Sequence, residues 1–179
     1  MLHDFCRSGL NSCGGEYPHG ALIMDAAGNL YGTTRGGGSR RGAGVAFQLS
    51  PHNTRASGWK ETVLYRFCRR DASHGDCADG KFPNGGLIMD KAGNLYGTTG
   101  FGGNESHSGV VFELTPPVVA GGSWTETVLV GFCGNGTRCR DGFGPSSGLL
   151  MDGAGNLYGT TPFGGINARG VAFELVKSQ

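Results

Sequence analysis

The sequence has little net charge, no long apolar run and no convincing helical periodicity, and each absence removes a class of protein. Its 15 Lys and Arg residues nearly balance 14 Asp and Glu residues, so there is no general electrostatic attraction to nucleic acid or to an anionic membrane. No apolar run approaches the roughly 18 residues that a membrane-spanning helix requires. We therefore expect neither a nucleic-acid partner nor a membrane span.

Common catalytic motifs are also missing. There is no G-x-S-x-G nucleophile elbow, no P-loop and no H-E-x-x-H. The histidines have no acid or second histidine at metal-ligand spacing; they are His3, His19, His52, His74 and His107. We therefore predict no catalytic residue, no metal site and no cofactor. Residues 1–5 read as part of a strand rather than as a signal peptide.

What the sequence has in abundance is internal repetition. The stretch Asp-x-Ala-Gly-Asn-Leu-Tyr-Gly-Thr-Thr begins at Asp25, Asp90 and Asp152, with nine of its ten positions identical in all copies. The copies are spaced 65 and 62 residues apart, and self-similarity at such a period indicates a repeat architecture. The 36 glycines fall at fixed places in each copy, which is typical of turns between many short strands.

Each copy predicts four short antiparallel strands. In the middle copy they cover residues 86–90, 95–99, 110–114 and 124–132, which are β-branched, aromatic or alternating in character. Four-stranded units in tandem indicate an all-β fold with three blades of a β-propeller. A three-fold prism or trefoil-like body is the alternative.

The ends of the chain suggest how the repeats close. We predict one domain, 1–179, with repeat units at 20–68, 85–133 and 147–176. Residues 1–6 align with the end of the fourth strand of the other copies, and we expect this strand to complete the last unit. Since three blades cannot close a ring, we expect either self-association, of two chains into a six-bladed ring or of many into a filament, or a chain that forms part of a longer propeller.

The repeated Asp-x-Ala-Gly-Asn predicts a tight turn. A type I turn followed by glycine in the left-handed region would let the aspartate accept backbone N–H groups, and asparagine tolerates positive φ. The alternative is that these aspartates are calcium ligands or a catalytic carboxylate cluster, but a calcium loop requires several oxygen ligands at close spacing and each turn has only one acid. The turn residues are Asp25, Gly28, Asn29, Asp90, Gly93, Asn94, Asp152, Gly155 and Asn156.

Six cysteines form three local pairs, one in each copy. The separations of 7, 9 and 6 residues suit variable loops closed by disulfides better than the tighter spacing of zinc ligands. Disulfides imply an oxidising compartment, so we expect an extracellular or periplasmic protein. The predicted pairs are Cys6–Cys13, Cys68–Cys77 and Cys133–Cys139.

Aromatic and basic side chains are the candidates for ligand binding. Trp59 and Trp124 precede a fourth strand, where they would either stack on sugar rings or cap a blade edge. Glu61 or Glu126 would supply hydrogen bonds to a sugar. The same choice between fold and ligand arises for Tyr31, Tyr96 and Tyr158. A basic cluster would bind an anion or carboxylate, or form a solvated loop; it consists of Arg35, Arg40 and Arg41.

The motif G-N-L-Y-G-T-T, followed by Gly-Gly and then by G-V-x-F-x-L, resembles the bacterial tandem-repeat family called GloVer. All three copies match it, opening with residues 22–25, 87–90 and 149–152. The resemblance covers nearly the whole chain. It implies a propeller-like protein that is exported or surface-displayed, and it implies no catalytic residues.

These observations predict a non-catalytic exported protein that acts as a binding or scaffold module, with a glycan or a protein as its ligand. One alternative is a polysaccharide hydrolase or lyase with Asp25, Asp90 and Asp152 gathered at a propeller axis. Another is a structural polymer assembled through open sheet edges.

Overall fold

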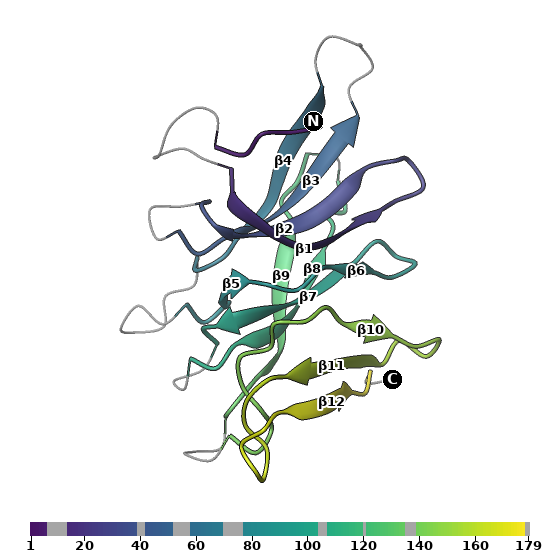
Figure 1. Ribbon diagram of the computed structural model, residues 1–179. Helices are drawn as coiled ribbons and strands as arrows, with labels where there is room; N and C mark the ends of the chain where they lie inside the picture. Colours follow the sequence, from purple (N-terminus) through teal and green to yellow (C-terminus); the bar gives the residue numbers. More distant parts are fainter. Residues whose placement is uncertain are drawn as a thin grey trace.

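The protein is an all-β molecule, as the sequence predicts (Figure 1). The computed structural model describes residues 1–6, 14–38, 42–51, 58–69, 77–103, 107–119, 121–134 and 139–177. Over these ranges the chain forms twelve strands and no helix. In particular, none of this part of the chain forms a helix long and apolar enough to cross a membrane.

The strands form three antiparallel sheets, one for each repeat. The first sheet contains β1 (Glu16–Met24), β2 (Leu30–Gly36), β3 (Val45–Pro51) and β4 (Trp59–Arg66), in that order. The second contains β5 (Lys81–Pro83), β6 (Ile88–Met89), β7 (Leu95–Phe101), β8 (Val110–Thr115) and β9 (Thr125–Gly131). The third contains β10 (Leu150–Met151), β11 (Leu157–Thr161) and β12 (Val171–Leu175).

One edge of each sheet is less regular than the sequence predicts. In the second sheet, β5 and β6 pair with opposite ends of β7, so Lys81 lies opposite Phe101 and Met89 opposite Leu95. In the first sheet the single strand β1 covers the same edge, with a register shift between His19 and Ile23. Sequence reasoning missed β5, because three residues ending in proline carry no periodicity.

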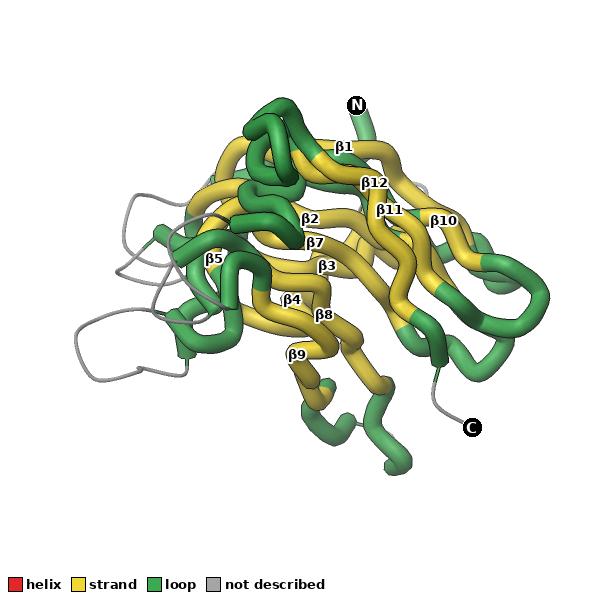
Figure 2. The backbone as a smooth tube through the Cα atoms, turned by 90° about the horizontal axis from the view of Figure 1, so that it is seen from below, coloured by secondary structure: helices red, strands yellow, loops and turns green. Residues whose placement is uncertain are grey.

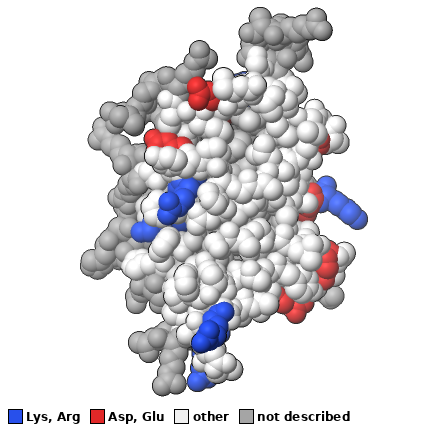
Figure 3. Space-filling view, in the orientation of Figure 1, with Lys and Arg blue, Asp and Glu red and all other residues white. Residues whose placement is uncertain are grey.

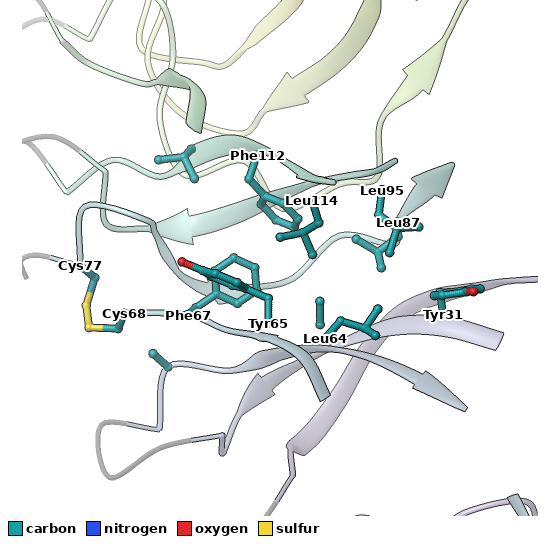
Figure 4. Close-up of a cluster of buried hydrophobic side chains, with 13 residues drawn as sticks. Tyr31, Leu64, Tyr65, Phe67, Cys68, Cys77, Leu87, Leu95, Phe112 and Leu114 are labelled. Carbon is teal, nitrogen blue, oxygen red and sulfur yellow. A yellow bond between two sulfur atoms is a disulfide. The ribbon is translucent and has the colours of Figure 1, made fainter. Parts of the chain in front are cut away.

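The sheets stack in chain order, with the second between the first and the third (Figure 1), and they overlap when the molecule is seen from below (Figure 2). We call their contacts junction 1–2 and junction 2–3. At junction 1–2, Leu64 and Phe67 from the first repeat pack against Leu87, Phe112 and Leu114 from the second (Figure 4). A second cluster, which includes Tyr96, Val111, Phe132, Leu149 and Leu157, fills junction 2–3.

The repeated glycine of L-Y-G-T-T makes room for a phenylalanine of the neighbouring strand. Gly97 lies directly opposite Phe112, and a Cβ on Gly97 would come within 2.6 Å of the Phe112 Cζ. Gly32 and Phe47 repeat the arrangement in the first sheet. A ring that covers a strand glycine restores the packing that the glycine lacks, which explains why this glycine recurs.

The first threonine of L-Y-G-T-T connects consecutive sheets. The Thr33 hydroxyl donates to the carbonyl oxygen of Gly85 at 3.2 Å, across junction 1–2. The Thr98 hydroxyl donates in the same way to the carbonyl oxygen of Ser147, at 3.1 Å across junction 2–3. Each buried hydroxyl therefore holds the backbone of the next repeat.

Two of the three predicted cysteine pairs are disulfides: Cys68–Cys77 and Cys133–Cys139. Cys13, the predicted partner of Cys6, lies outside the described residues. Each of the two bridges closes the loop that follows the last strand of one sheet.

The first six residues lie beside the first sheet and are not assigned to a strand. Phe5 packs edge-on against Phe47, with ring centres 5.0 Å apart. Phe67, which follows the last strand of the first sheet, packs in the same way on Phe112 of the second sheet, at 4.9 Å. Phe5 therefore packs on the first sheet as Phe67 packs on the second. Closure of a ring by these residues stays a prediction.

Candidate functional site

The aspartate of each repeated turn holds its own turn together. In the first copy, Asp25 Oδ1 accepts the backbone N–H groups of Ala27 and Asn29, at 2.9 and 2.8 Å. Asp25 Oδ2 accepts the Asn29 side-chain amide at 2.8 Å and the Tyr31 hydroxyl at 2.9 Å. Asp90 and Asp152 make the same four hydrogen bonds in the other copies.

The glycines of these turns have the expected left-handed backbone, with φ of 82°, 86° and 90° at Gly28, Gly93 and Gly155. The expectation of positive φ at the asparagines was wrong, since none of them appears among the non-glycine residues with that conformation. Their side chains instead donate to the aspartate, which the sequence pattern alone did not indicate.

The hydrogen bonds of the turn shift the pKa values of the aspartate and of the tyrosine. Burial alone would raise the pKa of Asp25, but the hydrogen bonds from Asn29, Tyr31 and Ala27 outweigh it and lower the pKa. Burial, together with the hydrogen bond to Asp25, raises the pKa of Tyr31 to about 12. Because the folded-state pKa of Asp25 is lowered, its contribution to stability is fully present above the ordinary carboxyl pKa and is lost as the pH falls through the lowered, folded-state pKa.

A further side chain reaches each tyrosine hydroxyl, and here the copies differ. In the first copy the Gln48 amide donates to the Tyr31 hydroxyl at 3.0 Å. In the second copy a carboxylate occupies this place: Glu113 Oε1 lies 3.0 Å from the Tyr96 hydroxyl, which is also 3.1 Å from Asp90 Oδ2. A hydroxyl has one proton and can donate to only one of two carboxylates at a time.

This difference predicts the effect of exchanging the two side chains. Glu113→Gln should raise the free energy of unfolding at pH 7 by about 0.5–1 kcal/mol. The new amide would donate to the Tyr96 hydroxyl, which could then donate its own proton to Asp90. Gln48→Glu, the matched reverse change, should lower it by about the same amount. Urea denaturation of both variants checks this, and a loss of stability in Glu113→Gln would contradict it.

The three aspartates are therefore committed to local structure. Each carboxylate accepts three hydrogen bonds from its own turn and lies within hydrogen-bond distance of the tyrosine hydroxyl, a pattern that favours turn formation over acid–base chemistry. Among the described residues no group of three or more His, Cys, Asp and Glu could hold a metal ion. Structure does add one pair that the sequence search did not find: His3 Nε2 lies 3.1 Å from Glu61 Oε2, across 58 positions of sequence.

The candidate ligand residues lie in different places. Trp59 begins β4 and packs against the core of the first sheet, whereas Trp124 directly precedes β9 and packs against the cluster of junction 1–2. Arg35 is exposed on β2, with its guanidinium carbon 5.5 Å from the centre of the Phe82 ring. Arg40 and Arg41 lie outside the described residues. Figure 3 shows that the described charged side chains on the face drawn lie in small separate groups.

Two grooves follow the junctions. The first, about 530 Å³ in volume, lies beside junction 1–2; we call it the Trp124 groove, and the residues that matter below are Gln48, Thr62, Tyr65, Arg66, Arg69 and Trp124. The second, about 350 Å³, lies beside junction 2–3 and includes Glu113, Glu174 and Lys177. Arg35 and Trp59 line neither groove.

Sequence reasoning missed Arg66 and Arg69, although a signal was present. The aligned residues of the second copy are Gly131 and Gly134, so the two arginines distinguish one copy from the other. Binding residues tend to occur where the copies of a repeat differ, since identical residues serve the common fold.

Comparison with known proteins gives one positive result. The family model described as the Gloeobacter/Verrucomicrobia repeat matches residues 1–173. Searches of the curated proteins and of the solved structures gave no match. The match covers nearly the whole chain and all three copies of the motif. The chain therefore belongs to the Gloeobacter/Verrucomicrobia repeat family.

Proposed function

We propose that the protein is a non-catalytic, exported scaffold module that self-associates, with two copies forming a six-bladed, propeller-like ring. One observation carries the proposal. Certain positions of the repeat are buried where two sheets meet at an internal junction. The aligned residues at the outer faces of the stack are exposed.

The outer face of the third sheet lacks a covering sheet among the described residues. Thr33 and Thr98, which donate across the internal junctions, are each 1% exposed, whereas the aligned Thr160 is exposed and contacts Ser147 of its own repeat at 3.0 Å. Leu150, on the same sheet, is 67% exposed. This face therefore resembles half of a junction.

The outer face of the first sheet presents the opposite half. Leu87 and Leu149, which face the preceding sheet at the two junctions, are 2% and 7% exposed. The aligned Leu22 is 48% exposed, and Met24 on the same strand is 66% exposed. Burial of such side chains is favourable by about 25 cal/mol per Å² of apolar surface.

The two faces fit each other because each internal junction pairs one face of each kind. Contact between the third sheet of one chain and the first sheet of another chain would have the same arrangement as junctions 1–2 and 2–3. Propellers have four to eight blades, and two copies of three sheets lie within that range. Residues 1–4 of the second chain would then pair with β12 of the first chain. Among the described strands, β12 pairs only with β11.

Two disulfides support the exported location in this proposal. Cys68–Cys77 and Cys133–Cys139 would persist in an oxidising compartment and not in a reducing cytosol. The proposed scaffold would therefore assemble outside the cytoplasm.

Light scattering coupled to gel filtration, without reductant, tests the assembly. We expect twice the chain mass of 18.5 kDa for the wild type and one chain mass for Leu22→Asp, because a charge placed in the new junction would be desolvated. Val118→Asp is the matched control, since Val118 is also exposed but belongs to the second repeat, between β8 and β9, and this variant should stay dimeric. A monomeric wild type would overturn the proposal, and a polydisperse mass would favour the structural polymer.

A further inference from the structure

The Trp124 groove differs in charge from the groove beside junction 2–3. Arg66 and Arg69 line it, and none of the described residues that line it is acidic. The groove beside junction 2–3 is lined by Glu113 and Glu174, with Lys177 as the one cation among its described lining residues. The two grooves therefore favour ligands of different charge.

Three side chains of the Trp124 groove are peculiar to the first copy of the repeat. Gln48 replaces the acid found at Glu113 and Glu174, while Arg66 and Arg69 replace Gly131 and Gly134. Gln48 also serves the fold, because its amide donates to the Tyr31 hydroxyl. Arg66 and Arg69 are exposed and the second copy folds without them, so a ligand explains these two arginines better than packing does.

The cations are arranged beside aromatic surface. The guanidinium carbon of Arg69 lies 5.9 Å from the centre of the Tyr65 ring, within the range of a cation–π contact. The Arg69 backbone N–H donates to Asp79 Oδ2 at 2.9 Å, and the Tyr65 hydroxyl donates to the same oxygen at 2.7 Å. Asp79 is fully buried, so the base of this part of the groove is fixed.

Trp124 supplies a flat apolar surface. It is half-buried, packs against the cluster of junction 1–2 and lines the groove. Its position is thus set by the core while part of the side chain stays accessible. Thr62 is exposed in the same groove, where its hydroxyl and the Gln48 amide can form hydrogen bonds.

We propose that the Trp124 groove binds a short anionic oligosaccharide that carries carboxylate groups, such as a chain of uronic acids. Arg66 and Arg69 pair with carboxylates, which suit the planar guanidinium group. Trp124 packs against a sugar ring, and Gln48 and Thr62 hydrogen-bond to hydroxyl groups. The groove volume of about 530 Å³ lies within the range of small-molecule sites. This site does not depend on the self-association proposed above.

Tryptophan fluorescence can test the site because the chain has only two tryptophans. Trp59→Phe leaves Trp124 as the reporter in the groove, and Trp124→Phe leaves Trp59 as a reporter elsewhere. On titration with tetragalacturonate at low ionic strength, we expect a saturable change in Trp59→Phe and none in Trp124→Phe. Galactotetraose, a neutral sugar of equal length, should bind at least about tenfold more weakly, because it cannot pair with the arginines.

A charge variant completes the test. Arg66→Gln with Arg69→Gln in the Trp59→Phe protein should lower the association constant at least about tenfold, whereas Arg140→Gln, an exposed change outside the groove, should leave it unchanged. Far-UV circular dichroism confirms that both fold. Equal binding of the neutral sugar, unchanged binding by the double variant, or tighter binding of an oligoglutamate peptide would overturn the proposal. The mass measurement above decides self-association separately.

Discussion

Replacing Phe112 by alanine should lower the free energy of unfolding by about 3–5 kcal/mol. The ring is fully buried and meets the Phe67 ring at 4.9 Å in junction 1–2. Its strand partner is Gly97, so the variant would place alanine opposite glycine. Neither residue has a side chain that could fill the space, and a cavity that cannot collapse costs the full amount.

The third copy supplies the control for this measurement. Phe173 is the aligned residue and faces Gly159 and Phe132 in the same way, but it is only half-buried. Phe173→Ala should therefore cost about 1–2 kcal/mol. Urea denaturation of both variants provides the comparison. Equal losses would mean that burial at the junctions is not what stabilises the stack.

A second large effect is expected where two backbones touch across junction 2–3. In Gly85→Ala the added Cβ would lie 2.7 Å from the carbonyl carbon of Ser147 and closer still to its oxygen. Because the obstacle is backbone, the sheets must move apart, and we expect a loss of about 3 kcal/mol or more. The same change would weaken the Thr98 hydrogen bond to this carbonyl.

Gly148→Ala tests whether this loss comes from the collision. Gly148 follows Ser147 in the same junction, yet the nearest atom to its added Cβ, the Gly86 carbonyl oxygen, is 3.6 Å away. Neither Gly85 nor Gly148 has a positive φ, so backbone strain does not differ between them. Thermal unfolding should show a large decrease in Tm for Gly85→Ala only. A similar decrease in both would assign the effect to chain flexibility instead.

The sequence predicts those features that depend on neighbouring residues. Strand alternation, the turn at Asp90 and the disulfides Cys68–Cys77 and Cys133–Cys139 each involve residues a few positions apart. The physical causes of these features are the alternation of side chains along a strand, the conformation of glycine and the closure of a short loop. All three can be recognised in the sequence of a single repeat. Repetition then shows that the pattern is not accidental.

Features formed between copies could not be predicted in this way. The Thr33 hydrogen bond to Gly85 spans 52 positions, and no rule of periodicity identifies its acceptor. The Trp124 groove likewise combines Arg66 from the first repeat with a segment preceding β9. Only the stacking of sheets brings such residues together, and stacking depends on the packing of whole faces.

The turn network has a consequence for how the chain folds. All four hydrogen bonds to Asp25 come from residues two to six positions away, so this hairpin needs no distant partner. Such hairpins form in about 1–10 μs, whereas contacts across tens of residues require slower closure of long loops. Three nearly identical hairpins should therefore exist before the sheets stack. Correct assembly then depends on the residues that differ between copies to prevent pairing of the wrong repeats.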